Sequence, residues 1–332
     1  MRALVYTAPE KVELSDYPRP KLAPGESEVK VEVAGVCGSD ISGFLGHSSI
    51  RKPPLIMGHE FVGQLADGRR VVANPLISCG RCMACLSGAQ NLCDSWRLLG
   101  AGQTQGTFAE SVAVPSEQIY ALPEEIPSSL AIFTEPLANI VHMFRLISPA
   151  PLFRLAIVGA GTMGALTVAL SQLLGARETL IVDVNDQRLQ TMKVIGATAA
   201  VNTGSAEGIA AAQRLAGRGF DVVIDASGSA MARQMAFDLC RPGGQVCLLG
   251  MAAQRSEVNF VASIRKEHRA VMSFAYTPVD FRRALDLLIA REVDLTRWME
   301  SMPLEQGQRA LEKMSRAPGA TLKMMLEVSR PN

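Results

Sequence analysis

The sequence predicts an α/β protein with a doubly wound parallel sheet and a second, β-rich part. The chain has 332 residues, which is more than one ordinary hydrophobic core accommodates and is enough for two domains. Its first 130 residues contain short β-prone runs separated by Gly, Pro and charged residues. From about residue 150 to 275, strand-like runs alternate with helical ones, which is typical of βαβ units and a parallel sheet.

The N-terminal part is predicted to form many short strands. They are the runs RALVYT, EVKVEVAGV, EFVGQLA, RVVANP and FAESVAV. Prolines between these runs supply the turns that many short strands require. The apolar segment 128–147 then predicts helix on both sides of Pro136, with Ser128 or Ser129 as a cap.

The C-terminal segment is predicted to rejoin the β-rich part. An amphipathic helix opens at Pro278, and the run ATLKMMLEV is typical of a strand. We assign this strand to the first domain because a lone strand needs a sheet to join. The predicted domains are therefore residues 1–137 with 276–332, and residues 138–275.

A glycine-rich turn, VGAGTMG, lies between an apolar strand and an apolar helix. Gly159, Gly161 and Gly164 follow the G-x-G-x-x-G spacing, and Asp183 ends the next strand nineteen residues after Gly164. This context predicts a Rossmann dinucleotide site, with the pyrophosphate at the helix N-terminus. A purely structural turn with a helix-capping aspartate is the alternative. The predicted cofactor residues are Gly159, Gly161, Thr162, Met163, Gly164, Asp183 and Arg188.

The residue at the end of the second strand favours NAD over NADP. Asp183 can accept hydrogen bonds from ribose hydroxyls, and its carboxylate would repel a 2′-phosphate. Arg188 weakens this preference because its side chain could meet that phosphate.

Four cysteines in one short loop predict a structural metal site. Their spacing is C-x2-C-x2-C-x7-C, and four thiolates surround a tetrahedral zinc ion without leaving a position for water. An iron–sulfur cluster is less favoured, and free or disulfide-bonded cysteines are the other alternative. The residues are Cys79, Cys82, Cys85 and Cys93.

The order of the motifs resembles that of the zinc-dependent medium-chain alcohol dehydrogenases, and above all their polyol (sorbitol) and threonine dehydrogenase branch. The motifs are GVCGSD, GHE, the four-cysteine loop, TEPLA and VGAGTMG, and the resemblance covers essentially the whole chain. It implies a Rossmann NAD-binding domain and a GroES-like catalytic domain. It also implies two zinc ions per chain, one catalytic and one structural.

The resemblance implies a catalytic metal site in the N-terminal part. Cys37 and His59 match zinc ligands, Glu60 matches a third, and Glu135 matches a direct or water-bridged one. Cys37 as thiolate and Glu60 as carboxylate would already offset both charges of Zn²⁺. We therefore expect Glu60 and Glu135 to alternate as zinc ligand, or one of them to act through water. Asp40 matches the carboxylate that holds the histidine ring.

The implied reaction is hydride transfer between NAD and a secondary alcohol, with zinc stabilising the alkoxide. Ser39 matches the hydroxyl that takes the substrate's proton. Two positions depart from the family. Ser42 replaces a proton-carrying histidine, so proton exit needs water or His47, and Ala275 replaces an arginine beside Tyr276. Sorbitol itself and phosphorylated sugars are therefore disfavoured.

Composition excludes other classes of function. Lys+Arg and Asp+Glu number 33 and 32, which gives no footprint for nucleic acid or an anionic membrane. We expect no signal peptide and no stretch of about 20 apolar residues, hence a cytoplasmic protein. We expect a homodimer or homotetramer acting on a small alcohol or ketone. The alternatives are a non-catalytic NAD-binding sensor and a metal-free quinone reductase.

Overall fold

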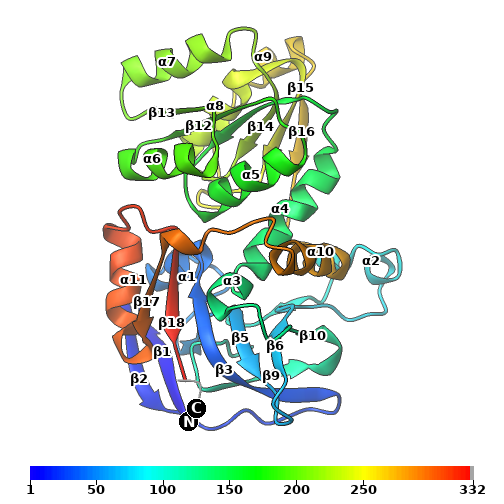
Figure 1. The fold of residues 1–332 in the computed structure, drawn as a ribbon, viewed down its shortest axis with the longest axis vertical. Coiled ribbons are helices and arrows are strands. Elements are labelled where there is room, and N and C mark those ends of the chain that lie inside the picture. The colour runs from blue at the N-terminus through cyan, green and yellow to red at the C-terminus, as the bar shows by residue number, and fades with distance from the viewer. Residues whose placement is uncertain (330–332) are drawn as a thin grey trace. The chain divides into compact units, whose positions relative to one another are not determined.

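The computed structural model describes residues 1–329 and divides into two compact units (Figure 1). The first unit contains Met1–Glu135 together with Thr277 and the residues that follow it. The second unit is Pro136–Tyr276. These borders lie close to the expected ones after residues 137 and 275, and the polypeptide leaves the first unit and returns to it.

The first unit is built on mainly antiparallel sheets, in which β17 and β18 form a parallel pair. Its largest sheet has seven strands in the order β10-β6-β5-β3-β18-β17, with β9 also paired to β3. A three-stranded sheet has the order β2-β1-β4, and β7 pairs with β8. The strands are β1 Arg2–Ala8, β2 Lys11–Asp16, β3 Glu26–Val36, β4 Leu55–Ile56, β5 Glu60–Gln64, β6 Arg70–Ala73, β7 Leu76–Ile77, β8 Arg97–Leu98, β9 Ser111–Pro115, β10 Ile119–Ala121, β17 Met299–Pro303 and β18 Lys323–Glu327.

The helices of this unit are short, and local sequence signals set where they begin. For example, α10 begins where Thr277 and Asp280 cap each other reciprocally around Pro278, which occupies the first helical position. The α-helices are α1 Gly38–Phe44, α2 Met83–Leu86, α3 Ser128–Ala131, α10 Pro278–Ile289 and α11 Gly307–Arg316. The 3₁₀ helices are η1 Gln90–Leu92, η2 Ser116–Gln118, η3 Thr296–Trp298 and η4 Leu304–Gln306.

The second unit contains a six-stranded parallel sheet in the order β13-β12-β11-β14-β15-β16. Counted within the unit, this order is 3-2-1-4-5-6, which is the doubly wound dinucleotide-binding order. Strands buried on both faces explain apolar runs such as LAIV and LIV. The strands are β11 Arg154–Val158, β12 Glu178–Asp183, β13 Ala199–Asn202, β14 Phe220–Asp225, β15 Cys240–Leu248 and β16 Arg269–Met272.

Helices cover this sheet on both faces. Helices α5 and α6 pack together on one face, and α7 and α8 pack together on the other (Figure 1). The helices are α4 Thr134–Ile147, α5 Thr162–Leu173, α6 Asp186–Ile195, α7 Ala206–Ala216, α8 Ala230–Leu239 and α9 Phe260–Arg265. The predicted α/β fold class, with a parallel-sheet Rossmann domain and a second β-rich domain, is confirmed.

The helical segment 128–147 differs in detail from the prediction. The break falls at residues 132–133, and Pro136 lies in the first turn of α4, where a proline removes no intrahelical hydrogen bond. Pro127 holds the cap position of α3, so the predicted serine cap is wrong. Ser128 instead donates to Glu32 at 2.6 Å and accepts from Arg70 at 2.7 Å.

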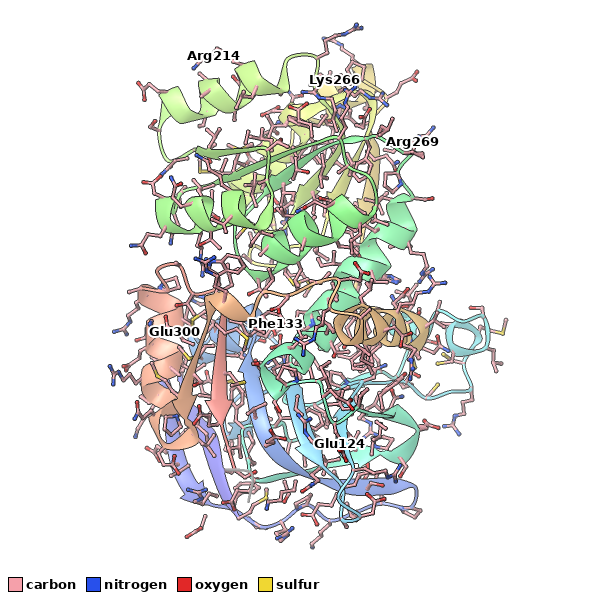
Figure 2. All side chains as sticks on the ribbon, in the orientation of Figure 1. Glu124, Phe133, Arg214, Lys266, Arg269 and Glu300 are labelled. Carbon is pink, nitrogen blue, oxygen red and sulfur yellow. The ribbon has the colours of Figure 1, made fainter. Side chains whose placement is uncertain are left out.

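The same segment also corrects the expectation that no stretch is long and apolar enough to cross a membrane. By length and composition alone, Ser128–Ile147 is long and apolar enough to cross a membrane. However, 72% of its most apolar stretch is buried inside the protein. Phe133, in the break between α3 and α4, is 1% exposed (Figure 2). A buried core segment accounts for the apolar composition.

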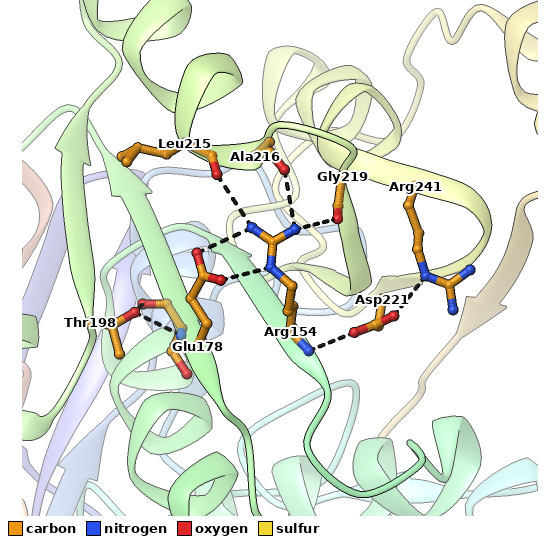
Figure 3. Close-up of polar contacts among 9 residues, drawn as sticks. Arg154, Glu178, Thr198, Leu215, Ala216, Gly219, Asp221 and Arg241 are labelled. Atoms are coloured by element: carbon orange, nitrogen blue, oxygen red, sulfur yellow. Dashed lines mark hydrogen bonds and ion pairs between the residues drawn. The ribbon is translucent and has the colours of Figure 1, made fainter.

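Arg154 links the start of the parallel sheet to the end of α7 (Figure 3). Its guanidinium donates to both oxygens of Glu178, at 2.7 and 3.2 Å. It also donates to the carbonyls of Leu215, Ala216 and Gly219. The last carbonyls of a helix have no partner within the helix, so Arg154 acts as a cap for α7.

We expect Arg154→Met to destabilise the parallel-sheet unit by about 2 kcal/mol, because charge-assisted hydrogen bonds to several acceptors are lost together. Arg241→Met is the matched control. Arg241 pairs with Asp221 near the surface, with 43% of its side chain exposed, so its loss is expected to cost less than about 1 kcal/mol. Urea unfolding measures both changes, and equal effects in the two variants would contradict the capping role.

Candidate metal and cofactor sites

Cys37, His59 and Glu60 come together because β3 pairs with β5. The two strands are antiparallel, and Gly35 lies opposite Glu60. Cys37 follows β3 and precedes α1, while His59 directly precedes β5. One ligand atom from each of the three residues lies within 4.8 Å of the others, and these donors suit a zinc ion.

A buried pair of charges supports the histidine. Asp40 has an oxygen 3.5 Å from Nδ1 of His59 and 3.3 Å from Nε of Arg51, and none of the three side chains is more than 4% exposed. Burial alone would raise the pKa of Asp40, but His59 and Arg51 lower it to about 2. Burial lowers the pKa of His59, but Asp40 and Cys37 outweigh it and raise that pKa in the metal-free chain. Asp40 is therefore a carboxylate beside the ring of His59, in a position suited to orient it.

Lys323 is the unexpected member of this cluster. The side chain is 1% exposed, and Nζ donates to both oxygens of Glu60, at 2.8 and 2.6 Å. Burial lowers the pKa of Lys323, while Glu60, Cys37 and Glu135 raise it, with a net rise. Lys323 is therefore a buried ammonium group that lies near three side chains able to carry negative charge, those of Glu60, Cys37 and Glu135.

The remaining expected residues of this site differ in their surroundings. Glu135, in the first turn of α4, is outside the three-donor group but close enough to act on Lys323. Ser39 is half-buried in α1. His47 is exposed, and Tyr276 is 1% exposed.

The four-cysteine loop forms a second cluster of donors. The sulfur atoms of Cys79, Cys82, Cys85 and Cys93 lie within 4.8 Å of one another. The Cys82–Cys85 and Cys79–Cys85 separations are 3.5 and 3.9 Å. Two sulfurs at about 2.3 Å from a tetrahedral zinc ion would lie about 3.8 Å apart, so the residues fit that metal.

Backbone groups prepare this loop for thiolates. Hydrogen bonds from the backbone N–H groups of Arg81 and Cys82 lower the pKa of Cys79 to about 6. The backbone N–H groups of Cys79 and Ser95 point at Sγ of Cys93, at 3.3 and 3.4 Å. All seven cysteines of the chain are free.

The glycine turn has the geometry that its sequence predicts. Gly159 has φ +113°, a conformation that favours glycine. A Cβ on Gly164 would lie 2.0 Å from the carbonyl oxygen of Gly159, so only glycine allows α5 to approach the turn. Gly161 has nothing within 4 Å of the position of a Cβ and precedes Thr162, where α5 begins.

Asp183 is held at the carboxyl end of β12. Its oxygens accept hydrogen bonds from the backbone N–H groups of Ala160, Val184 and Asn185, at 2.6, 2.8 and 2.9 Å. The carboxylate is thereby fixed beside the glycine turn. Burial lowers the pKa of nearby Arg188, while Asp183 opposes this shift.

Arg51 and Lys323 were missed by sequence reasoning. Lys323 had a detectable signal, since it stands alone in the apolar run TLKMML of a strand assigned to a sheet. A fully buried lysine is rare unless it is paired, so such a residue indicates a buried partner. Arg51 gave no comparable signal because it stands among polar and proline residues of a loop.

Comparisons with known proteins agree with the two units and their sites. Residues 23–124 match the model of the alcohol dehydrogenase GroES-like domain, and residues 162–290 match that of the zinc-binding dehydrogenases. A probable D-xylulose reductase A of Aspergillus clavatus is 33% identical over 86% of this chain and 85% of its own length. An L-threonine 3-dehydrogenase of Chelativorans sp. is 33% identical over 78% of this chain and 79% of its own.

Solved structures show the same fold over nearly the whole chain. A zinc-binding dehydrogenase of Sinorhizobium meliloti 1021, bound to NADP, has a TM-score of 0.88 at 29% identity and covers 98% of each chain. An alcohol dehydrogenase of E. coli CFT073, complexed with NADH, has a TM-score of 0.90 at 25% identity. It covers 98% of this chain and 99% of its own.

This chain belongs to the zinc-binding dehydrogenases that combine a GroES-like domain with a Rossmann domain. Within them it belongs to the polyol and threonine dehydrogenase branch of the medium-chain alcohol dehydrogenases. The resemblance seen in the sequence is confirmed.

We expect Gly164→Ala to lower the unfolding free energy by about 2 kcal/mol, because the new methyl group collides with backbone. Gly161→Ala is the matched control, and it is expected to unfold like the parent while binding a dinucleotide more weakly. Thermal unfolding without cofactor and titration with NADH separate the two effects. Unchanged stability of Gly164→Ala would contradict the close packing of α5 on the turn.

Proposed function

We propose that this protein is an NAD-dependent zinc dehydrogenase that interconverts a secondary alcohol and a ketone, with a polyol or related hydroxylated metabolite as substrate. The convergence of Cys37, His59 and Glu60, in a chain of this family, carries the proposal. Sequence relatives named for xylulose, threonine and sorbitol support this class of substrate.

In the proposed mechanism, Cys37 and His59 would hold the catalytic zinc ion, with Glu60 or Glu135 as a further ligand. Zinc supplies a Lewis acid for the substrate hydroxyl, and NAD supplies the hydride acceptor. Asp40 fixes the ring of His59 so that its other nitrogen faces the metal. Ser39 would accept the hydroxyl proton of the substrate while passing its own hydroxyl proton on through the nicotinamide ribose, so that it stays neutral.

One position departs from what the resemblance to the polyol branch implies for the substrate site. Ala275 stands where that resemblance implies an arginine, so we expect no charge-assisted donor from this position. We therefore propose a substrate that needs no such donor and disfavour sorbitol and sugar phosphates. Water serves as the exit for the proton, because Ser42 cannot relay it as a histidine would.

The cofactor and the second metal complete the proposal. Asp183 beside the glycine turn favours a free ribose 2′-hydroxyl, and hence NAD over NADP. We assign a structural zinc ion to the four-cysteine loop, which gives two zinc ions per chain. None of the seven cysteines forms a disulfide, which is typical of a reducing compartment, and we propose the cytoplasm.

The rival functions use the same fold differently. A sensor without turnover or a metal-free quinone reductase would not need a set of Cys, His and Glu donors with a supporting Asp40. The intact set favours the dehydrogenase.

We expect purified protein to contain two zinc ions and to form NADH with some secondary alcohols, polyols, cyclitols or amino alcohols. Cys37→Ser should lose one zinc ion and turnover while still binding NADH, since the dinucleotide turn is untouched. Cys93→Ser should lose the other zinc ion. Metal analysis and a screen at 340 nm test this, and an active Cys37→Ser enzyme would refute the assignment.

We also propose a homodimer or homotetramer that forms through the exposed edge of the parallel sheet. Strand β16 pairs only with β15 among the described strands, and Arg269 on it is exposed (Figure 2). Helix α9 beside it presents Phe260, Val261 and Ile264, which are 61, 60 and 72% exposed. Such an apolar edge is suited to a second copy.

We expect Ile264→Asp to reduce the assembly to smaller species, because the charge would be buried in the contact. Val194→Asp is the matched control, since Val194 on α6 is 61% exposed and α6 packs against β12 and β13, at the opposite end of the sheet from β16. Light scattering with size-exclusion chromatography gives both masses. A monomeric parent protein, or equal masses for the parent and Ile264→Asp, would contradict this edge as the contact.

A further inference from the structure

Lys323 and Glu60 form an ion pair that is fully enclosed by the protein. The two side chains are 1% and 0% exposed, and both carboxylate oxygens accept from the same ammonium group. Removing two charges from water costs free energy. A buried ion pair therefore often stabilises a fold no more than apolar side chains of similar volume would. The position of this pair, beside two other donors to a metal, suggests what it does.

The local backbone is arranged to hold the carboxylate against the lysine. A Cβ on Gly35 would lie 2.3 Å from an oxygen of Glu60, so the glycine leaves the space that this carboxylate occupies. Lys323 begins β18, which pairs with β3 just beside Gly35. The carbonyl of Val36, next to Cys37, lies 3.5 Å from Nζ. The lysine therefore approaches the metal donors from the opposite side of β3 to β5.

Charge balance gives the pair a consequence for the metal. Cys37 as thiolate and Glu60 as carboxylate would offset both charges of Zn²⁺, and Glu135 adds a third anion nearby. A carboxylate that already accepts from an ammonium at both oxygens has less charge to give to a metal ion. With its carboxylate shared in this way, Glu60 would be a weak, displaceable ligand.

We propose that Lys323 is a positioning residue that restrains Glu60 from binding the catalytic metal fully, and so keeps a coordination position for the substrate. This inference rests on the proposed zinc site. Lys323 contacts neither substrate nor cofactor in the proposed site, and it acts only through Glu60. No covalent or redox step is involved.

The test uses the full chain with Co²⁺ in place of zinc, because the visible bands of Co²⁺ report its coordination. Cobalt in the four-cysteine loop is removed from the comparison by subtracting the spectrum of Cys37→Ser. The variants are Lys323→Met, Lys323→Arg, Glu60→Gln and the double variant Lys323→Met with Glu60→Gln. Chelator competition gives the zinc affinity of each.

We expect Lys323→Met to change the cobalt bands, to tighten zinc about tenfold and to lower kcat by about tenfold or more, since the released carboxylate binds the metal. Lys323→Arg should resemble the parent because it keeps the cation. In the Glu60→Gln background, Lys323→Met should leave the bands unchanged, because two residues that act through one contact are not additive.

Two results would overturn the proposal. One is a cobalt spectrum that Lys323→Met leaves unchanged when Glu60 is present. The other is an equal change with and without Glu60, which would mean that the lysine acts only as a distant charge. If Lys323→Met does not fold, Lys323→Gln takes its place, because it also removes the cation but keeps a polar side chain beside Glu60, and bands identical to those of the parent would reject the role. A parent chain without zinc or turnover would instead reject the proposed function.

Discussion

The pairing of β3 with its neighbours is the constraint on which the rest of the site depends. On one side β5 is held in a register that sets Gly35 opposite Glu60, and on the other β18 sets Gly35 opposite Met325. A slip of one residue would turn alternate side chains to the other face of the sheet. The donors to the metal and the buried lysine would then separate.

Much of this arrangement could be predicted from local patterns. The glycine turn and Asp183 follow a strand–turn–helix pattern whose physical requirements leave few choices. The four cysteines lie within one short loop, so their spacing alone brings the sulfurs together. Cys37 and His59 are distant in sequence, so no local pattern joins them. Only the family resemblance predicts that they share one site.

What escaped prediction depends on contacts between distant segments. Lys323 meets Glu60 only through the pairing of β18 with β3, and no periodicity specifies that partner. Arg51 reaches Asp40 from a loop whose course is set by the surrounding core. The break at residues 132–133 was not predicted, because no glycine or proline stands there, while Pro136 is tolerated in the first turn of α4.

The split of the first unit has a consequence for how the protein is made. Lys323 follows its partner Glu60 by 263 residues in the sequence, and the whole second unit lies between them. Because domains fold as units during synthesis, the Rossmann unit can be complete while Glu60 still lacks its cation. The ion pair between Glu60 and Lys323 therefore forms only after β18 has been synthesised and has paired with β3.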